Sequence, residues 1–123
     1  MRNNEKLETK FQILISYLRS SNDLTFFEAV YKTARSIPKG KVTTYSTIAK
    51  FIGYPRASRA VGWAMRACSY SDVPCHRVVR ADGLVSGFPD DVEKRIKELR
   101  RERIPVRKRR IVNFDRYFYD DLK

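Results

Sequence analysis

Residues 44–67 contain two short helical patterns separated by a break, and this arrangement constrains the fold more than any other feature of the chain. Thr44 is a suitable N-cap for the first segment, "YSTIAKFIG", in which Ile48 and Phe51 are expected to face the interior. Gly53-Tyr54-Pro55 interrupts the pattern, and a second helix is expected over "RASRAVGWAMRA". Two helices joined by a tight turn that contains glycine are typical of a helix-turn-helix.

The second of these helices combines small side chains with positive charge. Its small residues and its arginines are interleaved: Ala57, Ser58, Ala60, Gly62 and Ala64 with Arg56, Arg59 and Arg66. Such a helix can approach a nucleic-acid groove closely while its cations reach phosphates. Small residues also permit tight packing between helices, and the pattern alone leaves both interpretations open.

The remaining segments complete a small, mainly helical domain. A helix from Glu5 to Arg19 is expected to pack on the body, and Thr25 is a plausible N-cap for a helix over residues 26–37. "HRVVRADGLVSG" predicts a hairpin turned at Asp82-Gly83, and a last helix is expected over residues 91–103. The predicted fold class is mainly α with a small β wing, a winged helix-turn-helix. The predicted divisions are a packing helix at 1–22, the winged domain at 23–104 and a basic and aromatic tail at 105–123.

Length and charge narrow the function classes. The chain has 123 residues, enough for one domain, and 26 Lys and Arg against 14 Asp and Glu give a net charge of +12. Polyanions are the natural partners, and the alternative is a charge-rich, well-solvated surface. The amino terminus lacks the apolar core of a signal peptide, and no run is long enough to cross a membrane. With two cysteines and no disulfide scaffold, we expect a reducing cytoplasm, and association with the nucleoid if the organism is prokaryotic.

The segment "VPCHRVV" places Cys75 beside His76, the only histidine of the chain. A thiol becomes nucleophilic when a base or a positive field favours the thiolate. Neighbours on a strand point to opposite faces, so His76 would need a bend or a bridging water to reach the sulfur, and Pro74 favours irregular backbone. The alternative is an inert, buried cysteine. Cys68, Cys75 and His76 give too few ligands for zinc, so no metal is expected, and a disulfide between Cys68 and Cys75 is conceivable under oxidation.

Three motifs taken together resemble a known family. "IPKGKVTTYSTIA", "RASRAVGWAMR" and "VPCHRVV" occur in the order and at the spacings of the O6-alkylguanine-DNA alkyltransferases, and the resemblance covers residues 26–102. It implies a winged helix-turn-helix that binds the minor groove and flips the damaged guanine. It also implies irreversible transfer of the alkyl group to the cysteine of the Pro-Cys-His-Arg motif, in a single turnover and without an organic cofactor or metal.

The resemblance assigns roles to residues one by one. Cys75 corresponds to the alkyl acceptor, His76 to the residue that takes its proton through a water, and Glu102 to the acid that orients this histidine. Tyr45 corresponds to the tyrosine at the flipped base and its phosphate, and Arg59 to the arginine that fills the gap in the duplex. Further DNA contacts are expected from Arg56, Ala60, Arg66 and Arg77, and the base pocket is expected to include Val78, Phe88 and Pro89.

Several departures from the family pattern define the alternatives. Cys68 stands near a position where members commonly carry asparagine, and "FPDD" replaces a glycine-containing loop of the base pocket. The tail resembles the alkyltransferase-like proteins, which bind alkylated guanine without repairing it and pass the lesion to excision repair, but which have another residue at the cysteine position. We expect a monomeric repair protein for duplex DNA that contains O6-alkylguanine. The alternatives are a lesion sensor that recruits excision-repair proteins and a winged-helix regulator that reads sequence in the major groove.

Overall fold

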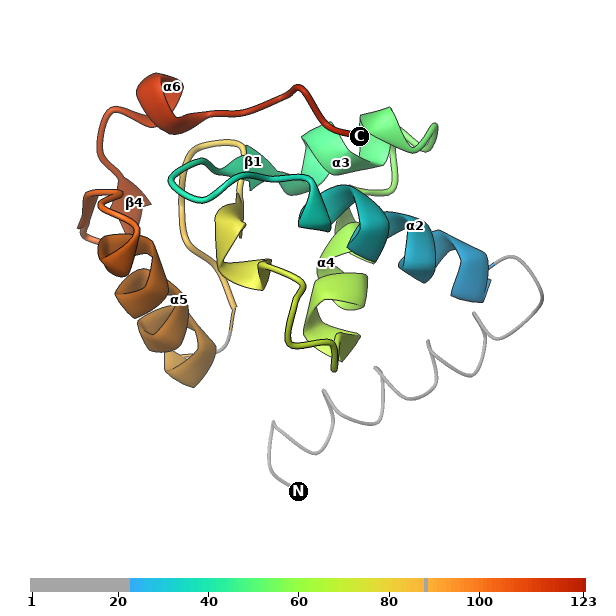
Figure 1. Ribbon diagram of the computed structural model, residues 1–123, viewed down its shortest axis with the longest axis horizontal. Coiled ribbons are helices and arrows are strands. Elements are labelled where there is room, and N and C mark those ends of the chain that lie inside the picture. Colours follow the sequence, from blue (N-terminus) through green and yellow to red (C-terminus); the bar gives the residue numbers. More distant parts are fainter. Residues whose placement is uncertain (1–22, 88) are drawn as a thin grey trace.

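Three helices pack around the first of two hydrophobic cores. The computed structural model describes residues 23–87 and 89–123. Helices α2 (Asp23–Arg35), α3 (Tyr45–Phe51) and α4 (Ser58–Ala67) contact one another in pairs (Figure 1). Their apolar faces meet in this core, to which each helix contributes a fully buried residue: Val30 from α2, Ile48 from α3 and Val61 from α4.

Helices α3 and α4 form the predicted helix-turn-helix. Oγ1 of Thr44 accepts a hydrogen bond from the Thr47 amide at 3.1 Å, as expected for the N-cap of α3. The helix ends where Gly53 takes a φ of +91°, a left-handed conformation that glycine adopts without strain. The expectation that Phe51 faces the interior is wrong, since 48% of this residue is exposed. Its place at the end of α3, beside the turn, leaves it without a covering element among the described residues.

The segment predicted as a self-pairing hairpin folds differently on its first arm. Strand β2 (Val78–Val79) pairs in parallel with β1 (Thr43–Thr44), which precedes α3. The turn lies where it was predicted, because the Gly83 amide donates to the Arg80 carbonyl at 2.8 Å and Gly83 has a φ of +81°. Beyond the turn, Leu84 forms an antiparallel bridge with Arg110 of the tail. Segments that precede and follow the helix-turn-helix in the chain are therefore paired next to this wing.

The second core joins α5 (Pro89–Arg101) to the wing and the tail. The tail forms strands β3 (Val106–Arg107) and β4 (Arg110–Ile111), paired as an antiparallel hairpin, and the short helix α6 (Phe114–Tyr117). It then crosses the molecule towards α3, as Figure 1 shows. The Tyr119 amide donates to the Val42 carbonyl at 2.8 Å and Leu122 is buried. The tail thus packs back on the body.

The structure agrees with the predicted class of a mainly helical protein with small β elements. The predicted helix at residues 5–19 lies outside the described residues, and the division at residues 22 and 104 stays a prediction. Among the described residues, no helix has the length and apolar character needed to span a bilayer.

Candidate active site

Cys75 and His76 lie in a tight turn and not in a strand. Residues Cys75–Arg77 form a 3₁₀ turn, η1, directly after Pro74, and the Arg77 amide donates to the Pro74 carbonyl at 2.9 Å. This is the bend that the sequence required, because it removes the strict alternation of side chains found in a strand. The turn leads straight into β2, so the paired strands fix its position.

Glu102, one residue beyond α5, receives hydrogen bonds from three residues. Its Oε2 lies 2.6 Å from Nε2 of His76 and accepts from Nη2 of Arg77 at 2.8 Å. Its Oε1 accepts from Nε of Arg77 at 3.0 Å and from the Gly40 amide at 3.0 Å. Only 7% of the Glu102 side chain is exposed, so this buried charge is compensated by its partners.

These contacts keep Glu102 ionised and set which nitrogen of His76 donates. Burial alone would raise the pKa of Glu102, but hydrogen bonds from Arg77, the Gly40 amide and His76 together lower that pKa to about 2. The carboxylate is therefore ionised at neutral pH and can only accept. We assign the proton of His76 to Nε2 on this basis, which leaves Nδ1 as the basic nitrogen.

The Cys75 thiol lies between the turn and the end of α4. Its Sγ is 3.7 Å from the Met65 carbonyl, and the Cys68 amide lies 3.4 Å from the same oxygen. Burial, followed by the neighbouring Cys68 thiol, raises the pKa of Cys75 to about 11, while the positive charge of Arg95 opposes this rise. Both cysteines are free and half-buried. Reaction at Cys75 near neutral pH therefore requires removal of its proton at the site.

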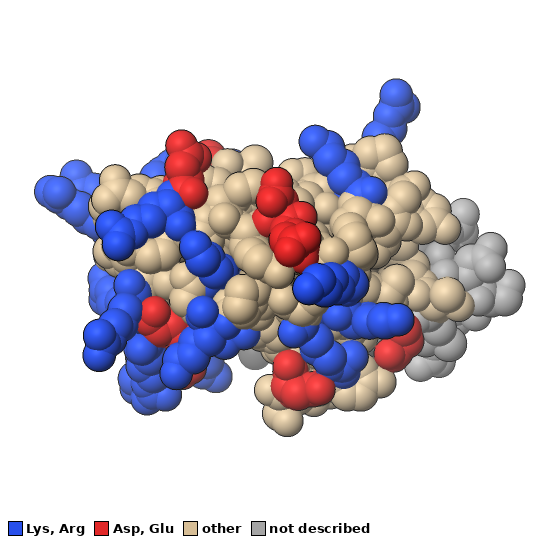
Figure 2. All heavy atoms as spheres, turned by 45° about the horizontal axis from the view of Figure 1, so that its top comes forward, with Lys and Arg blue, Asp and Glu red and all other residues tan. Residues whose placement is uncertain are grey.

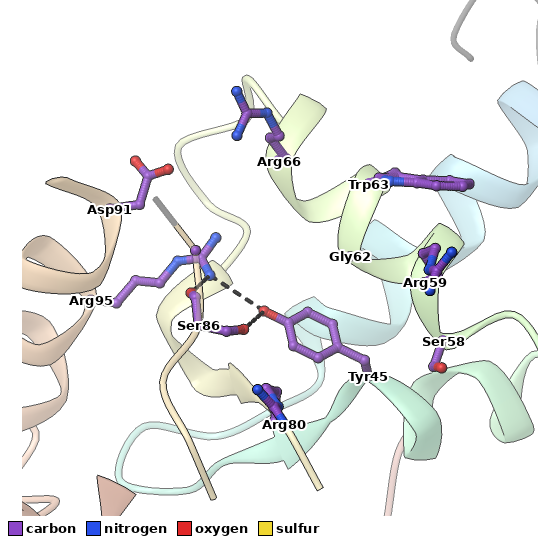
Figure 3. Close-up of a pocket in the computed structure, with 11 residues that line it drawn as sticks. Tyr45, Ser58, Arg59, Gly62, Trp63, Arg66, Arg80, Ser86, Asp91 and Arg95 are labelled. Atoms are coloured by element: carbon purple, nitrogen blue, oxygen red, sulfur yellow. Dashed lines mark hydrogen bonds between the residues drawn. The ribbon is translucent and has the colours of Figure 1, made fainter. Parts of the chain in front are cut away.

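A pocket of about 480 Å³ opens between α4, the wing and α5. Figure 3 shows Arg59, Trp63 and Arg66 on α4 at one side, Ser86 and Arg95 at the other, and Tyr45 between them. The Tyr45 hydroxyl lies 3.2 Å from Oγ of Ser86. The lining residues are Tyr45, Ser58, Arg59, Gly62, Trp63, Arg66, Arg80, Ser86, Gly87, Asp91 and Arg95.

The structure brings most of the residues predicted for catalysis and DNA contact to two places. Tyr45, Arg59 and Arg66 line the pocket. His76, in the turn that carries Cys75, contacts Glu102, and Cys75 is not among the residues that line the pocket. Arg56, just before α4, and Ala60, in its first turn, are absent from the lining of this pocket.

Four predicted residues are placed differently from the expectation or are not described. Arg77 donates to Glu102 and to the Ile37 carbonyl, at 2.9 Å, so its guanidinium points inward, which argues against the expected DNA contact. Val78 is 1% exposed, so its side chain belongs to the core and not to the wall of a base pocket. Phe88 and the side chain of Pro89 lie outside what the structure describes.

The sequence reading missed Ser86, Trp63 and Arg95 as pocket residues. Arg95 was detectable in principle, because it precedes Glu102 by seven residues, about two helical turns, along the helix that leads to Glu102. The sequence provided no reason to single out Arg95, because α5 contains many basic residues and several of them are exposed. Figure 2 shows basic side chains gathered at the end of the molecule where α5 and β4 lie in Figure 1.

Comparison with known proteins identifies the family. Residues 25–104 match the family described as "6-O-methylguanine DNA methyltransferase, DNA binding domain". The chain belongs to this family. The alkyltransferase resemblance drawn from the three sequence motifs is thereby confirmed.

Relatives and solved structures place the chain within the alkyltransferase family. It is 42% identical over 78 residues to the "Bifunctional transcriptional activator/DNA repair enzyme Ada" of Escherichia coli (strain K12), covering 63% of this chain and 22% of Ada. It is 35% identical over 94 residues to the "DNA base-flipping protein" of the same organism, covering 76% of this chain and 73% of that protein. The chain spans less than half the length of several curated relatives.

A solved structure supports the fold. The chain is similar to S. pombe Atl1, solved in complex with damaged DNA containing O6-carboxymethylguanine, with a TM-score of 0.72 and 29% identity. The similarity covers 77% of this chain and 94% of Atl1. The predicted winged helix-turn-helix is confirmed by this likeness to an alkyltransferase-type DNA-binding domain.

Proposed function

We propose that this protein repairs O6-alkylguanine in duplex DNA by flipping the damaged base towards the pocket and transferring its alkyl group to Cys75. The observation that carries the proposal is the contact of 2.6 Å between Glu102 and His76, and His76 lies in the same turn as Cys75. An ionised carboxylate that fixes an imidazole beside a thiol is the arrangement expected for an activated nucleophile. Membership of the alkyltransferase family supports the same reading.

The proposed chemistry uses only side chains of this chain, one water and the substrate. Nδ1 of His76 takes the thiol proton of Cys75 through a bridging water, and Glu102 stabilises the imidazolium that forms. The thiolate attacks the alkyl carbon, so that an S–C bond forms while the bond from that carbon to O6 breaks. The electron pair stays on guanine, which takes up one proton from water, while His76 gives the thiol proton back to water. The products are a thioether and unmodified guanine.

DNA contact is assigned to α3 and α4. Arg59 enters the gap left by the flipped base, and Tyr45 contacts the base and its rotated phosphate. Arg56, Ala60 and Arg66 approach the backbone of the duplex, where cations neutralise phosphates. Tyr45 suits this role because it stands in the pocket between the two walls drawn in Figure 3.

A lesion sensor is the second candidate, and one observation favours it. The pKa of Cys75, raised by burial to about 11, makes the resting thiol a weak nucleophile. A protein of this kind would bind O6-alkylguanine through the same contacts without accepting the alkyl group. Excision-repair proteins would then be its partners, whereas the transferase would act alone, as a monomer.

Mass spectrometry separates the two candidates. The protein is mixed with a duplex that bears one O6-methylguanine, and the intact mass is followed over hours. Trypsin leaves Cys68 and Cys75 on one peptide, residues 67–77, so fragment ions must locate the added methyl group. Methylation of Cys75 with restored guanine establishes transfer. Tight lesion binding without a gain in mass establishes the sensor, and label on Cys68 shows that the acceptor is misassigned.

A further inference from the structure

Arg95 of α5 contacts both Ser86 and Tyr45 in the pocket. From α5 its Nη1 donates to the Ser86 carbonyl at 2.6 Å and lies 3.3 Å from the Tyr45 hydroxyl, as the dashed lines of Figure 3 show. Gly87 makes this approach possible, because a Cβ at that position would stand 3.3 Å from Nη1 of Arg95. The side chain is therefore held in a defined place inside the pocket.

The anchoring contacts use one nitrogen of the guanidinium. A guanidinium carries five N–H donors, and both contacts of Arg95 are made by Nη1. Within the described residues, Nε and Nη2 have no acceptor at hydrogen-bond distance. Asp91, one turn earlier on α5, also lines the pocket but forms no ion pair with Arg95. Arg95 thus keeps a positive charge and donors for a ligand.

The charge of Arg95 acts on the place where the alkyl group must lie. Its field reaches the Cys75 sulfur, where it favours the negative form. The alkyl substituent of a bound lesion lies between O6 of guanine and this sulfur during transfer. A negative charge on the substituent would therefore be stabilised by Arg95 as well.

The other charged residues that line the pocket are also mostly positive. Arg59, Arg66 and Arg80 line it together with Arg95, against the single acid Asp91. A methyl group gains nothing from this charge, whereas a carboxylate accepts paired hydrogen bonds from a guanidinium. Phosphate contacts explain arginines at the rim on α4, but they do not explain a guanidinium held by Ser86 and Tyr45 on the opposite wall.

We propose that Arg95 makes this site selective for O6 substituents that carry a carboxylate, as in O6-carboxymethylguanine, over O6-methyl. This inference rests on the proposed function, since it names the substrate class of the same site. Arg95 acts as a specificity residue: its Nη1 stays with Ser86, and its remaining donors face the substituent carboxylate.

Binding of matched duplexes tests the inference. Duplexes with O6-carboxymethylguanine, O6-methylguanine or guanine at one position are titrated at constant salt, in a Cys75→Ser background that prevents transfer. The parent should bind the carboxymethyl lesion about tenfold more tightly than the methyl lesion, in line with a charge-assisted hydrogen bond at a partly exposed site. Arg95→Gln should bring this ratio to within about twofold, and the ratio is the readout because loss of the contact to Tyr45 affects both lesions alike.

Two further variants keep the test decisive. Arg95→Lys retains charge and the contact to the Ser86 carbonyl, so it should retain part of the preference and serves if Arg95→Gln unfolds. Arg101→Gln removes a solvent-exposed arginine of the same helix, paired with Glu98, and should leave the ratio unchanged. A ratio that is near one in the parent, or unaltered in both Arg95 variants, overturns the inference alone. If neither lesion binds more tightly than guanine, the proposed function falls and the inference falls with it.

Discussion

Nε2 of His76 lies 2.6 Å from Oε2 of Glu102, although 26 residues separate them in the chain. The same carboxylate accepts three contacts from the Arg77 guanidinium, at 2.8 to 3.1 Å. One buried anion therefore orients the candidate base and also compensates a buried cation that stands next to it in the turn. Loss of this carboxylate should affect both reactivity and stability, by separate routes that can be measured separately.

Replacing Glu102 by glutamine should slow alkylation of Cys75. Without the anion, the imidazolium that forms on His76 loses its stabilising partner, and the ring is no longer held with Nδ1 free to accept a proton. The reaction should therefore slow at least about tenfold at neutral pH. The rate should recover as pH rises and hydroxide removes the thiol proton. A pH–rate profile with free O6-benzylguanine measures this effect. Glu98→Gln, on the exposed face of α5, is the matched control, and identical profiles for Glu102→Gln and wild type would contradict the assigned role.

Acid should destabilise the wild-type protein in a defined window. The pKa of Glu102 is about 2 in the folded state against 4.5 for a free glutamate, so folding favours its ionised form. The contribution is complete above pH 4.5, amounts to about 3 kcal/mol and is lost as pH falls towards 2. Urea unfolding between pH 2.5 and 6 measures it. Glu102→Gln should be less stable at pH 6, by about 3 kcal/mol, and should show a flatter pH dependence, because Arg77 stays buried without its anion.

The sequence predicted the elements that depend on local patterns. The cap at Thr44, the break at Gly53 and the turn at Gly83 follow from side-chain chemistry and backbone conformation within a few residues. The bend at Cys75 followed from Pro74 in the same way. The pairing of Glu102 with His76 was available only through the family resemblance, because no local rule connects residues that far apart.

Features set by tertiary contacts were missed. Two-residue strands such as β1 and β2 carry no periodicity, so their parallel pairing has no sequence signal. The predicted hairpin is self-paired only next to its turn, where the Arg80 amide donates to the Leu84 carbonyl at 3.0 Å. Arg77 was predicted to contact DNA because most cations of the chain face solvent. As the last residue of η1, it instead directs its guanidinium to Glu102. Arg95 remained one of many basic residues until the fold placed it opposite Tyr45.

Removing Cys68 should make Cys75 more reactive. After burial, the neighbouring Cys68 thiol is the largest influence that raises the pKa of Cys75. Cys68→Ala should therefore lower this pKa and move the pH dependence of alkylation towards lower pH. Iodoacetamide trapping, with fragment ions to locate the label on Cys75, gives the rate across pH. A profile that does not move towards lower pH would show that Cys68 has no electrostatic effect on the acceptor.

Arg59 should matter for duplex DNA and not for the free base. If its side chain fills the gap in the duplex, Arg59→Ala should slow repair of O6-methylguanine in DNA by at least about tenfold, since unstacking costs a few kcal/mol that the arginine offsets. Reaction with free O6-benzylguanine needs no flipping and should stay within about twofold of wild type. Urea unfolding should be unchanged, because Arg59 is exposed on α4.

Arg56→Ala provides the matched control for Arg59. Arg56 is exposed just before α4 and is proposed to contact phosphate only, so its loss should weaken binding to damaged and undamaged duplexes alike and reduce the salt dependence by about one counterion. Arg59→Ala should add to this electrostatic loss a defect specific to the lesion, visible at saturating protein as a slower single-turnover rate. If both variants lose affinity equally and neither loses rate at saturation, Arg59 is another phosphate contact and the gap in the duplex is filled by a different residue.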